Sequence, residues 1–212
     1  MLMDFQKQKW STEFGKEYTD RNICKPDNLD EFYKKQYGVT RSEMNNKFLT
    51  QFVDRDSKIL EVGCNVGNQL RVLQRMGYTN LYGIELQDYA VEKAKELTKG
   101  INIIKGNADD IPFKDGYFDL VFTSGVLIHI SPENIKKVLE EIFRCSNKYI
   151  FGFEYYSDNY EKINYRGNDD LLWKTDFSKL YLKYIPNLKI EKYKKFKYID
   201  NNNEDLMFLL KK

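Results

Sequence analysis

The residues best suited to chemistry surround a turn that begins at Glu61. A mostly apolar run over residues 58–62 precedes the turn and is typical of a buried strand, and an apolar helical pattern starts at residue 70. Glycines stand at 63 and 67 between the two. Glycine lets a ligand approach the backbone closely, and the first N–H groups of a helix are free to bind it. A polar ligand is therefore expected at this turn.

The spacing within the turn separates it from two common nucleotide sites. Asn65 and Asn68 stand where the dinucleotide pattern G-x-G-x-x-G, counted from Gly63, requires glycine, and no G-K-[ST] of a P-loop occurs in the chain. The pattern E-x-G-x-N-x-G resembles the first motif of class I S-adenosylmethionine-dependent methyltransferases, usually [DE]-x-G-x-G-x-G. Asn65 replaces the middle glycine, and asparagine tolerates left-handed backbone angles. The resemblance implies S-adenosylmethionine as the cofactor, bound by Glu61, Gly63, Cys64, Asn65, Gly67 and Asn68.

An acid at the end of the next strand fits the same cofactor. Glu85 follows a predicted strand at 81–84 and lies 22 residues after Gly63, with Leu86 beside it. In dinucleotide folds an acid about 20 residues after the glycine turn accepts hydrogen bonds from ribose. Glu85 and Leu86 are therefore expected to contact the ribose end of the cofactor, although a surface carboxylate would also fit the pattern.

Two further segments resemble the third and fourth elements of these methyltransferases. Residues 106–113 resemble the element that meets adenine, which implies that Asn107 faces the exocyclic amine and the Ala108 N–H faces a ring nitrogen. Asp109 could take the amine instead. Residues 117–127 resemble the element whose strand end lines the methionine part of the cofactor, and this places Ser124 there. Four motifs in the expected order are much more specific than any one alone.

The candidate bases follow the fourth and fifth predicted strands. His129, the only histidine, stands among apolar residues, where histidine is often a core residue; at the edge of this sheet it could instead take a proton from an acceptor hydroxyl or amine. Glu154 and Tyr155 offer a second base and an aromatic wall. Methyl transfer needs little more, because the sulfonium is already electrophilic and the protein mainly aligns the reactants and excludes water.

Acceptor contacts are expected from the two ends of the chain. Trp10, Phe14 and Tyr18 recur at helical spacing, which predicts either a helix that covers a core edge or a lid from which Tyr18 and Arg21 reach inward. In the long connection after residue 153, Tyr156 offers an aromatic wall. Arg166 and Lys174 could grip a phosphate or carboxylate, or be ordinary surface charges.

The elements that must position these residues alternate regularly. Strand patterns separated by helical patterns of ten to fifteen residues predict right-handed crossovers and a parallel sheet, with ligands at the carboxyl ends of the strands. With a late hairpin at about 188–199 and 205–210, we expect an α/β, Rossmann-like doubly wound sheet of seven strands, mostly parallel with one antiparallel strand inserted at the edge. One domain is predicted: a helical cap at 1–53, a cofactor-binding core at 54–153, and a substrate connection with the C-terminal hairpin at 154–212.

Composition narrows the function classes. The 212 residues carry 34 Lys+Arg and 32 Asp+Glu, a formal net charge of +2, so no global basic excess indicates a nucleic-acid partner. Neither a leader nor a membrane-spanning run is recognised. The three cysteines are scattered without a C-x-x-C pair, which favours free thiols in a reducing cytoplasm and no metal site.

A closer resemblance covers nearly the whole chain. Residues 13–22, 125–130, 154–156, 165–167 and 170–177 resemble the pseudaminic acid biosynthesis-associated methylase family. That resemblance implies methylation of a bacterial surface-polysaccharide precursor of the capsule or nonulosonic-acid type, such as a nucleotide-linked sugar or a phosphoramidate. The expected partner is a small-molecule substrate containing a sugar or phosphate.

Three alternatives are weighed against this reading. A non-catalytic cofactor-binding partner protein would keep the glycine turn and Glu85 without needing His129. A nucleic-acid methyltransferase is disfavoured, because the chain lacks the [DNS]-P-P-[YFW] motif that holds a flipped base. A nicotinamide-dependent reductase is disfavoured by the missing glycine pattern.

Overall fold

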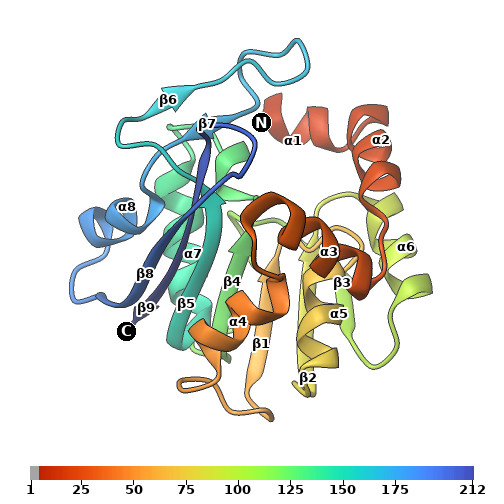
Figure 1. Ribbon diagram of the computed structural model, residues 1–212, viewed down its shortest axis with the longest axis vertical. Helices are drawn as coiled ribbons and strands as arrows, with labels where there is room; N and C mark the ends of the chain where they lie inside the picture. Colours follow the sequence, from red (N-terminus) through yellow and green to blue (C-terminus); the bar gives the residue numbers. More distant parts are fainter. Residues whose placement is uncertain (1–4) are drawn as a thin grey trace.

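The computed structural model describes residues 5–212, and its centre is a seven-stranded sheet in the order β3-β2-β1-β4-β5-β9-β8 (Figure 1). Helices cover both faces of the sheet (Figure 1). The sheet strands are β1 (Lys58–Val62), β2 (Asn80–Glu85), β3 (Asn102–Lys105), β4 (Phe118–Ser124), β5 (Ser146–Tyr155), β8 (Lys189–Lys197) and β9 (Glu204–Lys211). A separate two-stranded ribbon is formed by β6 (Glu161–Lys162) and β7 (Trp173–Lys174).

The helices fall into three groups along the chain. The N-terminal group is α1 (Phe5–Trp10), α2 (Glu13–Asn22), α3 (Pro26–Tyr37) and α4 (Arg41–Leu49). Within the alternating core lie α5 (Asn68–Arg75), α6 (Asp88–Leu97), the short 3-10 helix η1 (Leu127–His129) and α7 (Ile135–Cys145), and α8 (Phe177–Tyr184) precedes the final hairpin. The N-terminus of α4 is fixed by a reciprocal capping box between Thr40 and Glu43.

The pairing of the strands confirms the predicted fold class. Strands β1 to β5 run parallel, and the order reverses between β1 and β4, where open α/β sheets bind ligands. The one antiparallel strand, β9, is inserted between β5 and the edge strand β8. Because β9 is antiparallel, it begins at the edge of the sheet where β5 ends.

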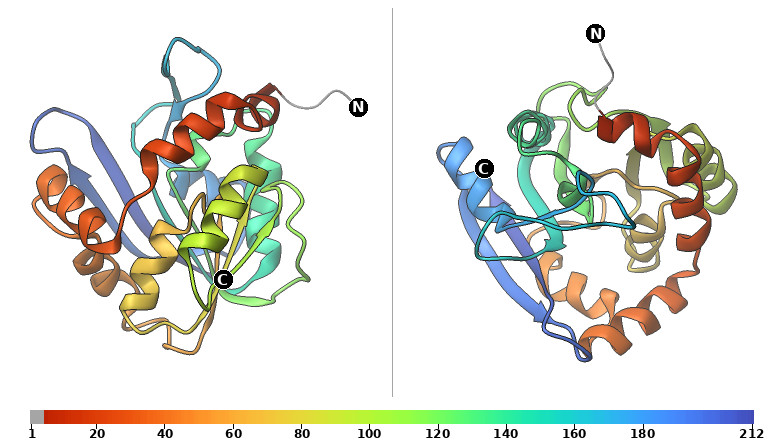
Figure 2. Two further views of the ribbon diagram at one scale, coloured as in Figure 1. Left: turned by 90° about the vertical axis from the view of Figure 1, so that its right-hand side faces the viewer. Right: turned by 90° about the horizontal axis from the view of Figure 1, so that it is seen from above.

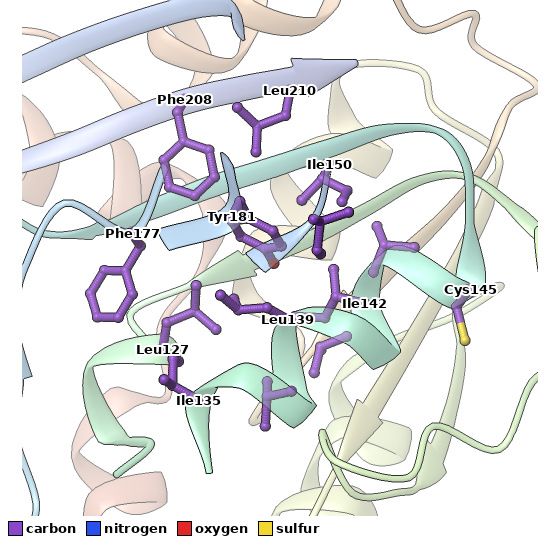
Figure 3. Close-up of a cluster of buried hydrophobic side chains, with 14 of the residues drawn as sticks. Leu127, Ile135, Leu139, Ile142, Cys145, Ile150, Phe177, Tyr181, Phe208 and Leu210 are labelled. Atoms are coloured by element: carbon purple, nitrogen blue, oxygen red, sulfur yellow. The ribbon is translucent and has the colours of Figure 1, made fainter. Parts of the chain in front are cut away.

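One face of the sheet packs against α7 and α8. Figure 3 shows this cluster, in which Leu139 and Ile142 from α7 and Tyr181 from α8 meet Ile150 and Phe208 from the sheet. The ring of Phe208 lies over Gly152, its register partner, where an added Cβ would come within 2.1 Å of the ring. Glycine is required there for the close approach.

The other face is covered by α4, α5 and α6, with α3 at the edge of the group. Met44, Phe48, Leu70 and Val91 belong to a second buried cluster on this face. Side chains alternate along β5, so Phe153 faces this side while Ile150 faces the other.

Helices α1 and α2 and the β6–β7 ribbon lie above the carboxyl ends of the parallel strands (Figures 1 and 2). Helix α2 is fastened to the core by the Tyr89 hydroxyl, which donates to Asp20 at 2.6 Å, and by the Asn68 side chain, which donates to the carbonyl of Asn22. The N-terminal helices therefore close over the end of the sheet where the sequence places the ligand.

Candidate active site

A cavity of about 380 Å³, called here the main cavity, opens at the carboxyl ends of the parallel strands. It brings together most of the predicted cofactor residues. The following of them line it: Glu61, Gly63, Cys64, Asn65, Asn68, Glu85, Leu86, Asn107, Ala108, Asp109 and Ser124. Gly67 does not line it; this glycine is the N-cap of α5 and has φ 75°. Its role is to turn the chain into the helix.

The glycine turn has the backbone that its motif requires. Gly63 and Gly67 have positive φ, and Asn65 has φ 47°, the left-handed conformation expected of a residue in the middle glycine position. A Cβ on Gly63 would lie 2.8 Å from the Val126 side chain. The Asn65 side chain fixes the turn, because its oxygen accepts from the Val66 N–H at 2.8 Å and its amide donates to the Thr19 hydroxyl of α2 at 3.1 Å.

Glu61 carries a polar atom that no described group satisfies. Its side chain is 2% exposed and lines the main cavity, and one carboxylate oxygen, Oε2, has no hydrogen-bond partner among the residues described. Burial raises the pKa of Glu61 well above its usual value, and the charge of Arg41 opposes that shift. A buried acceptor without a partner is costly unless a ligand supplies the donor. Glu61 therefore fits a ligand ammonium or N–H group at this point.

Glu85 is oriented by backbone groups on both of its oxygens. The Asn65 N–H donates to Oε2 at 2.9 Å, and the Gln87 N–H donates to Oε1 at 3.0 Å. Burial raises the pKa of this carboxyl, while these N–H groups favour its charged form. The Leu86 N–H also contacts this carboxylate. A carboxylate has about four acceptor positions, so Glu85 retains acceptor capacity for a ribose hydroxyl.

Residues 107–109, which sequence analysis assigns to adenine, line the main cavity but differ in their contacts. Asn107 and Ala108 line the main cavity. Asp109 also lines it, but its carboxylate forms an ion pair with Lys7 of α1 at 2.5 Å. The structure thus ties Asp109 to the N-terminal helices, and Asn107 is the better-placed group for an exocyclic amine.

His129 is held in one tautomer by the long connection. Its Nδ1 lies 2.6 Å from the carbonyl oxygen of Leu171; because a carbonyl only accepts, Nδ1 carries the hydrogen and Nε2 keeps its lone pair in the neutral ring. The ring stands between Trp10 and Tyr165, with centroid distances of 4.6 and 5.4 Å. Desolvation lowers the pKa of His129 to about 4, so the imidazole is neutral at physiological pH.

Glu154 does not have the surroundings expected of a catalytic base. It is fully buried and lies outside the linings of both cavities described here. Its carboxylate accepts from the Val126 N–H at 3.0 Å, just before η1, and burial raises its pKa to about 7. Glu154 acts as an acceptor for the start of the turn that carries His129 and therefore positions the histidine. Tyr155, the next residue, does line the main cavity.

A second cavity of about 280 Å³, called here the arginine cavity, lies beside the first. Arg21 from α2 and Arg166 from the connection both line it. Their contact with an acceptor stays a prediction. Tyr18, His129 and Tyr155 line both cavities. The two spaces therefore meet at the candidate base.

Two other predicted acceptor residues lie elsewhere. The hydroxyl of Tyr156 donates to Asp158, and its ring faces Lys195; Lys174 donates to the Asn203 side chain at 2.8 Å. Neither Tyr156 nor Lys174 lines a described cavity. Both side chains hold the connection to the C-terminal hairpin, which sequence spacing alone does not reveal.

The sequence analysis missed a group of contacts between the cap and the core. The Gln87 amide donates to the carbonyl of Thr12 at 3.0 Å, and its oxygen accepts from Thr19 at 3.3 Å. Gly15 allows this approach, since a Cβ there would lie 2.9 Å from the Gln87 side chain and even closer to the carbonyl oxygen of Trp10. Only the spacing of Trp10, Phe14 and Tyr18 hinted that α2 faces the site.

Comparison with known proteins agrees with this geometry. Residues 60–148 match a family described as "Methyltransferase domain". This segment is therefore similar to methyltransferase domains. It holds the glycine turn, Glu85, the adenine segment and His129, and S-adenosylmethionine is the cofactor of this class.

Curated relatives match about half of the chain. An uncharacterized protein of Haemophilus influenzae is 30% identical over 50% of this chain and 47% of its own length. The phosphoethanolamine N-methyltransferase of Plasmodium falciparum is 26% identical over 48% of this chain and 40% of its own length. The chain thus spans less than half the length of these two relatives.

A solved structure extends the likeness in fold to nearly the whole chain. The geranyl diphosphate C-methyltransferase of Streptomyces coelicolor, solved with Mg²⁺, geranyl diphosphate and S-adenosyl-L-homocysteine, has a TM-score of 0.71 over 98% of each chain, at 11% identity. At that identity the likeness concerns the fold. Within residues 5–212, no helix is long and apolar enough to cross a membrane, and no cluster of metal-ligating side chains is present.

Proposed function

We propose that this protein transfers the methyl group of S-adenosylmethionine to a small acceptor that bears an anionic group. The observation that carries the proposal is the meeting of two differently charged cavities at His129. The main cavity presents buried carboxylates, which suit the ribose and ammonium of the cofactor, and the arginine cavity presents Arg21 and Arg166, which suit a phosphate or carboxylate.

The residues of the main cavity fit the cofactor group by group. Asn107 and the Ala108 N–H would hold the adenine, Glu85 a ribose hydroxyl, and the unpartnered oxygen of Glu61 the ammonium. When bound, the cofactor supplies a methyl group on a positively charged sulfur. Ser124, at the end of β4, would line the methionine portion.

His129 would accept the proton that the acceptor loses. Its Nε2 lone pair is available because Nδ1–H is committed to the Leu171 carbonyl. A neutral imidazole of low pKa is a weak base, so its contribution would be to orient the acceptor hydroxyl or amine and to receive the proton as the bond to carbon forms. Trp10 and Tyr165 on either side would restrict water.

A surface-polysaccharide precursor is the acceptor class we favour. It follows from the resemblance to the pseudaminic acid biosynthesis-associated methylases, and a nucleotide-linked sugar or a phosphoramidate would place a phosphorus-bound oxygen near the two arginines. The name of the phosphoethanolamine N-methyltransferase also supports a phosphate-bearing acceptor. A cytoplasmic location agrees with the free thiols of Cys24, Cys64 and Cys145. A non-catalytic role would be favoured by a tightly packed or fully exposed histidine, whereas His129 lines both cavities.

Titration calorimetry tests the proposal directly. S-adenosylhomocysteine should bind the purified protein, NAD should not, and Glu85→Ala should weaken S-adenosylhomocysteine by about 10- to 100-fold, since it removes a charge-assisted hydrogen bond to the ribose. Glu96→Ala, on the exposed side of α6, is the matched control and should bind as the wild type does. Binding of NAD alone, or of neither ligand, would refute the proposal. Transfer of labelled methyl to phosphate-bearing acceptors then tests the reaction.

A further inference from the structure

The main cavity extends past the predicted cofactor contacts to a wall on the far side of Tyr155. This part, called here the aromatic lobe, is lined by Tyr33, Gln36 and Tyr37 from α3 and by Phe153, Tyr198 and Asp205 from the sheet and its last turn. None of these residues belongs to the four motifs that bind the cofactor. The lobe therefore needs a separate explanation.

The sheet topology builds the lobe. Asp205 near the start of β9 is the register partner of Tyr155 near the end of β5, and directly paired residues of antiparallel strands point to the same face. Asp205 is also paired with Phe196 of β8. The inserted antiparallel strand thus brings a carboxylate from the C-terminal hairpin to the edge where β5 carries its cavity residues.

A hydrogen-bond network orients Asp205. The carboxylate accepts from the hydroxyl of Tyr37 and, at 3.2 Å, from the hydroxyl of Tyr198. The Gln36 amide donates to the Tyr37 hydroxyl at 3.1 Å. Asp205 is 2% exposed, and its carboxylate retains acceptor positions beyond these two bonds. The lobe therefore offers several fixed hydrogen-bonding groups along an aromatic wall.

The aromatic rings of the lobe already contact a buried cation, the guanidinium of Arg41. Arg41 is fully buried, and its guanidinium lies 4.6 Å from the ring centroid of Phe153 and 5.3 Å from that of Tyr33. The electrostatic attraction of these rings for a cation is already engaged by Arg41. The charges of Lys174 and Arg41 also stabilise the charged form of Asp205, so the lobe does not require a ligand ammonium, whereas a neutral hydroxyl-bearing group can still donate to the carboxylate.

We propose that the aromatic lobe binds a neutral polyhydroxylated part of the methyl acceptor, with its C–H face on the tyrosine and phenylalanine rings and a hydroxyl donating to Asp205. This inference rests on the proposed function, because it assigns the acceptor two ends: an anionic group in the arginine cavity and a hydroxylated group in the lobe. His129 and Tyr155 line both the arginine cavity and the main cavity, of which the lobe is a part.

Saturation-transfer NMR on the protein loaded with S-adenosylhomocysteine tests the lobe. The probes are methyl α-D-glucopyranoside, which is neutral and hydroxylated, and ethanolamine, which is cationic; neither carries an anionic group for the arginines. The glucoside should receive saturation and ethanolamine should not. Asp205→Asn should weaken glucoside binding by about tenfold, the loss expected for a hydrogen bond to a charged group, and Tyr198→Phe should weaken it by a smaller factor.

Asp200→Asn is the matched control, because this exposed aspartate lies in the same β8–β9 turn and outside the cavity linings. It should leave glucoside binding unchanged. Calorimetry with S-adenosylhomocysteine shows whether each variant is folded and separates the two proposals, since a wild type that does not bind it refutes the methyltransferase function itself. The lobe proposal is overturned if S-adenosylhomocysteine binds but saturation reaches ethanolamine alone or neither probe. It is also overturned if Asp205→Asn and Tyr198→Phe both bind the glucoside as strongly as the wild type does.

Discussion

The main cavity and the arginine cavity adjoin at His129, but the chain builds them in different ways. The proposed cofactor contacts of the main cavity follow the ends of β1, β2, β3 and β4 over residues 61–124, so each is placed by one strand of a common sheet. The arginine cavity joins Arg21 of α2 to Arg166 of a connection almost 150 residues later. The first is fixed by the sheet, and the second by how separate segments pack on it.

This difference separates the part of the protein suited to a constant ligand, the cofactor, from the part suited to a variable one, the methyl acceptor. Strand ends in a parallel sheet are rigid and adjacent, which suits a ligand that must always be held in the same way. Segments that cross above the sheet can vary without disturbing its core, which suits an acceptor that differs between relatives. His129 belongs to both regions, because η1 follows β4 while its Nδ1 is held by the connection at Leu171.

The largest loss of activity is expected from removing the His129 side chain, which lines both cavities. His129→Ala should lower kcat by about 10²-fold, the lower end of the usual contribution of a general base, because the low pKa makes this imidazole a weak base; S-adenosylhomocysteine affinity should change little. Since the pKa of His129 is lowered to about 4, the neutral form persists as pH falls, and wild-type activity should show no loss near pH 6.5. An acid limb near 6.5 that disappears in His129→Ala would contradict the Leu171-bound neutral tautomer.

A smaller effect, confined to one region, is expected from the arginines. Arg166→Ala should raise KM for a phosphate-bearing acceptor by about tenfold or more, since a charge-assisted hydrogen bond is lost, and leave cofactor affinity unchanged. Arg166→Lys should recover part of the loss, because lysine keeps the charge without the bidentate geometry. Steady-state kinetics at saturating cofactor measures both. Equal losses in kcat and cofactor affinity would mean that Arg166 supports the fold of the connection.

Sequence reasoning succeeded where neighbouring residues determine the result. The glycine turn and Glu85 lie in short segments whose spacing reports a strand end, and the seven-stranded sheet followed from the alternation of patterns. Sequence spacing could not show that Glu154, Tyr156 and Lys174 lie outside both cavity linings, because their partners come from distant segments such as Val126 and Asn203. A side chain after a strand can point into a site or beneath it, and only the packing decides which.

The pH dependence of stability tests the positioning role given to Glu154. Its pKa is raised to about 7 in the folded protein from 4.5, so the folded state binds more protons over that range. Unfolding free energy therefore falls as pH rises from 4.5 to 7, by about 3 kcal/mol from this group alone. Glu154→Gln keeps an acceptor for the Val126 N–H without titrating, so its stability should vary less across this range. Urea denaturation of the wild type and of Glu154→Gln at both pH values measures the difference. If the variant has the same pH dependence as the wild type, the role given to the buried Glu154 carboxyl is wrong.

The smallest change in cofactor affinity is expected at Asn65, whose side chain joins the glycine turn to α2. Asn65→Gly restores the usual methyltransferase motif and fits φ 47° without strain, but it removes the bond from the Asn65 amide to Thr19 of α2. Equilibrium affinity for S-adenosylhomocysteine should change by less than about fivefold, because a neutral hydrogen bond contributes about 1 kcal/mol. Dissociation should be faster, since α2 closes over the cavity and is held less firmly.

Thr19→Val is the companion variant, because it removes the same bond from the α2 side and leaves the turn intact, although it also removes the bond from the Thr19 hydroxyl to Gln87. Stopped-flow measurement of product release should give acceleration in both variants if the bond between Asn65 and Thr19 matters, with the larger acceleration in Thr19→Val. Acceleration in Asn65→Gly alone would assign the effect to turn flexibility, and the asparagine would then serve the cofactor site without a part in holding the cap. Faster product release in both variants would show that the bond between Asn65 and Thr19 slows dissociation. The asparagine at the motif's glycine position would then link retention of the cofactor to α2, the helix that carries Tyr18 and Arg21.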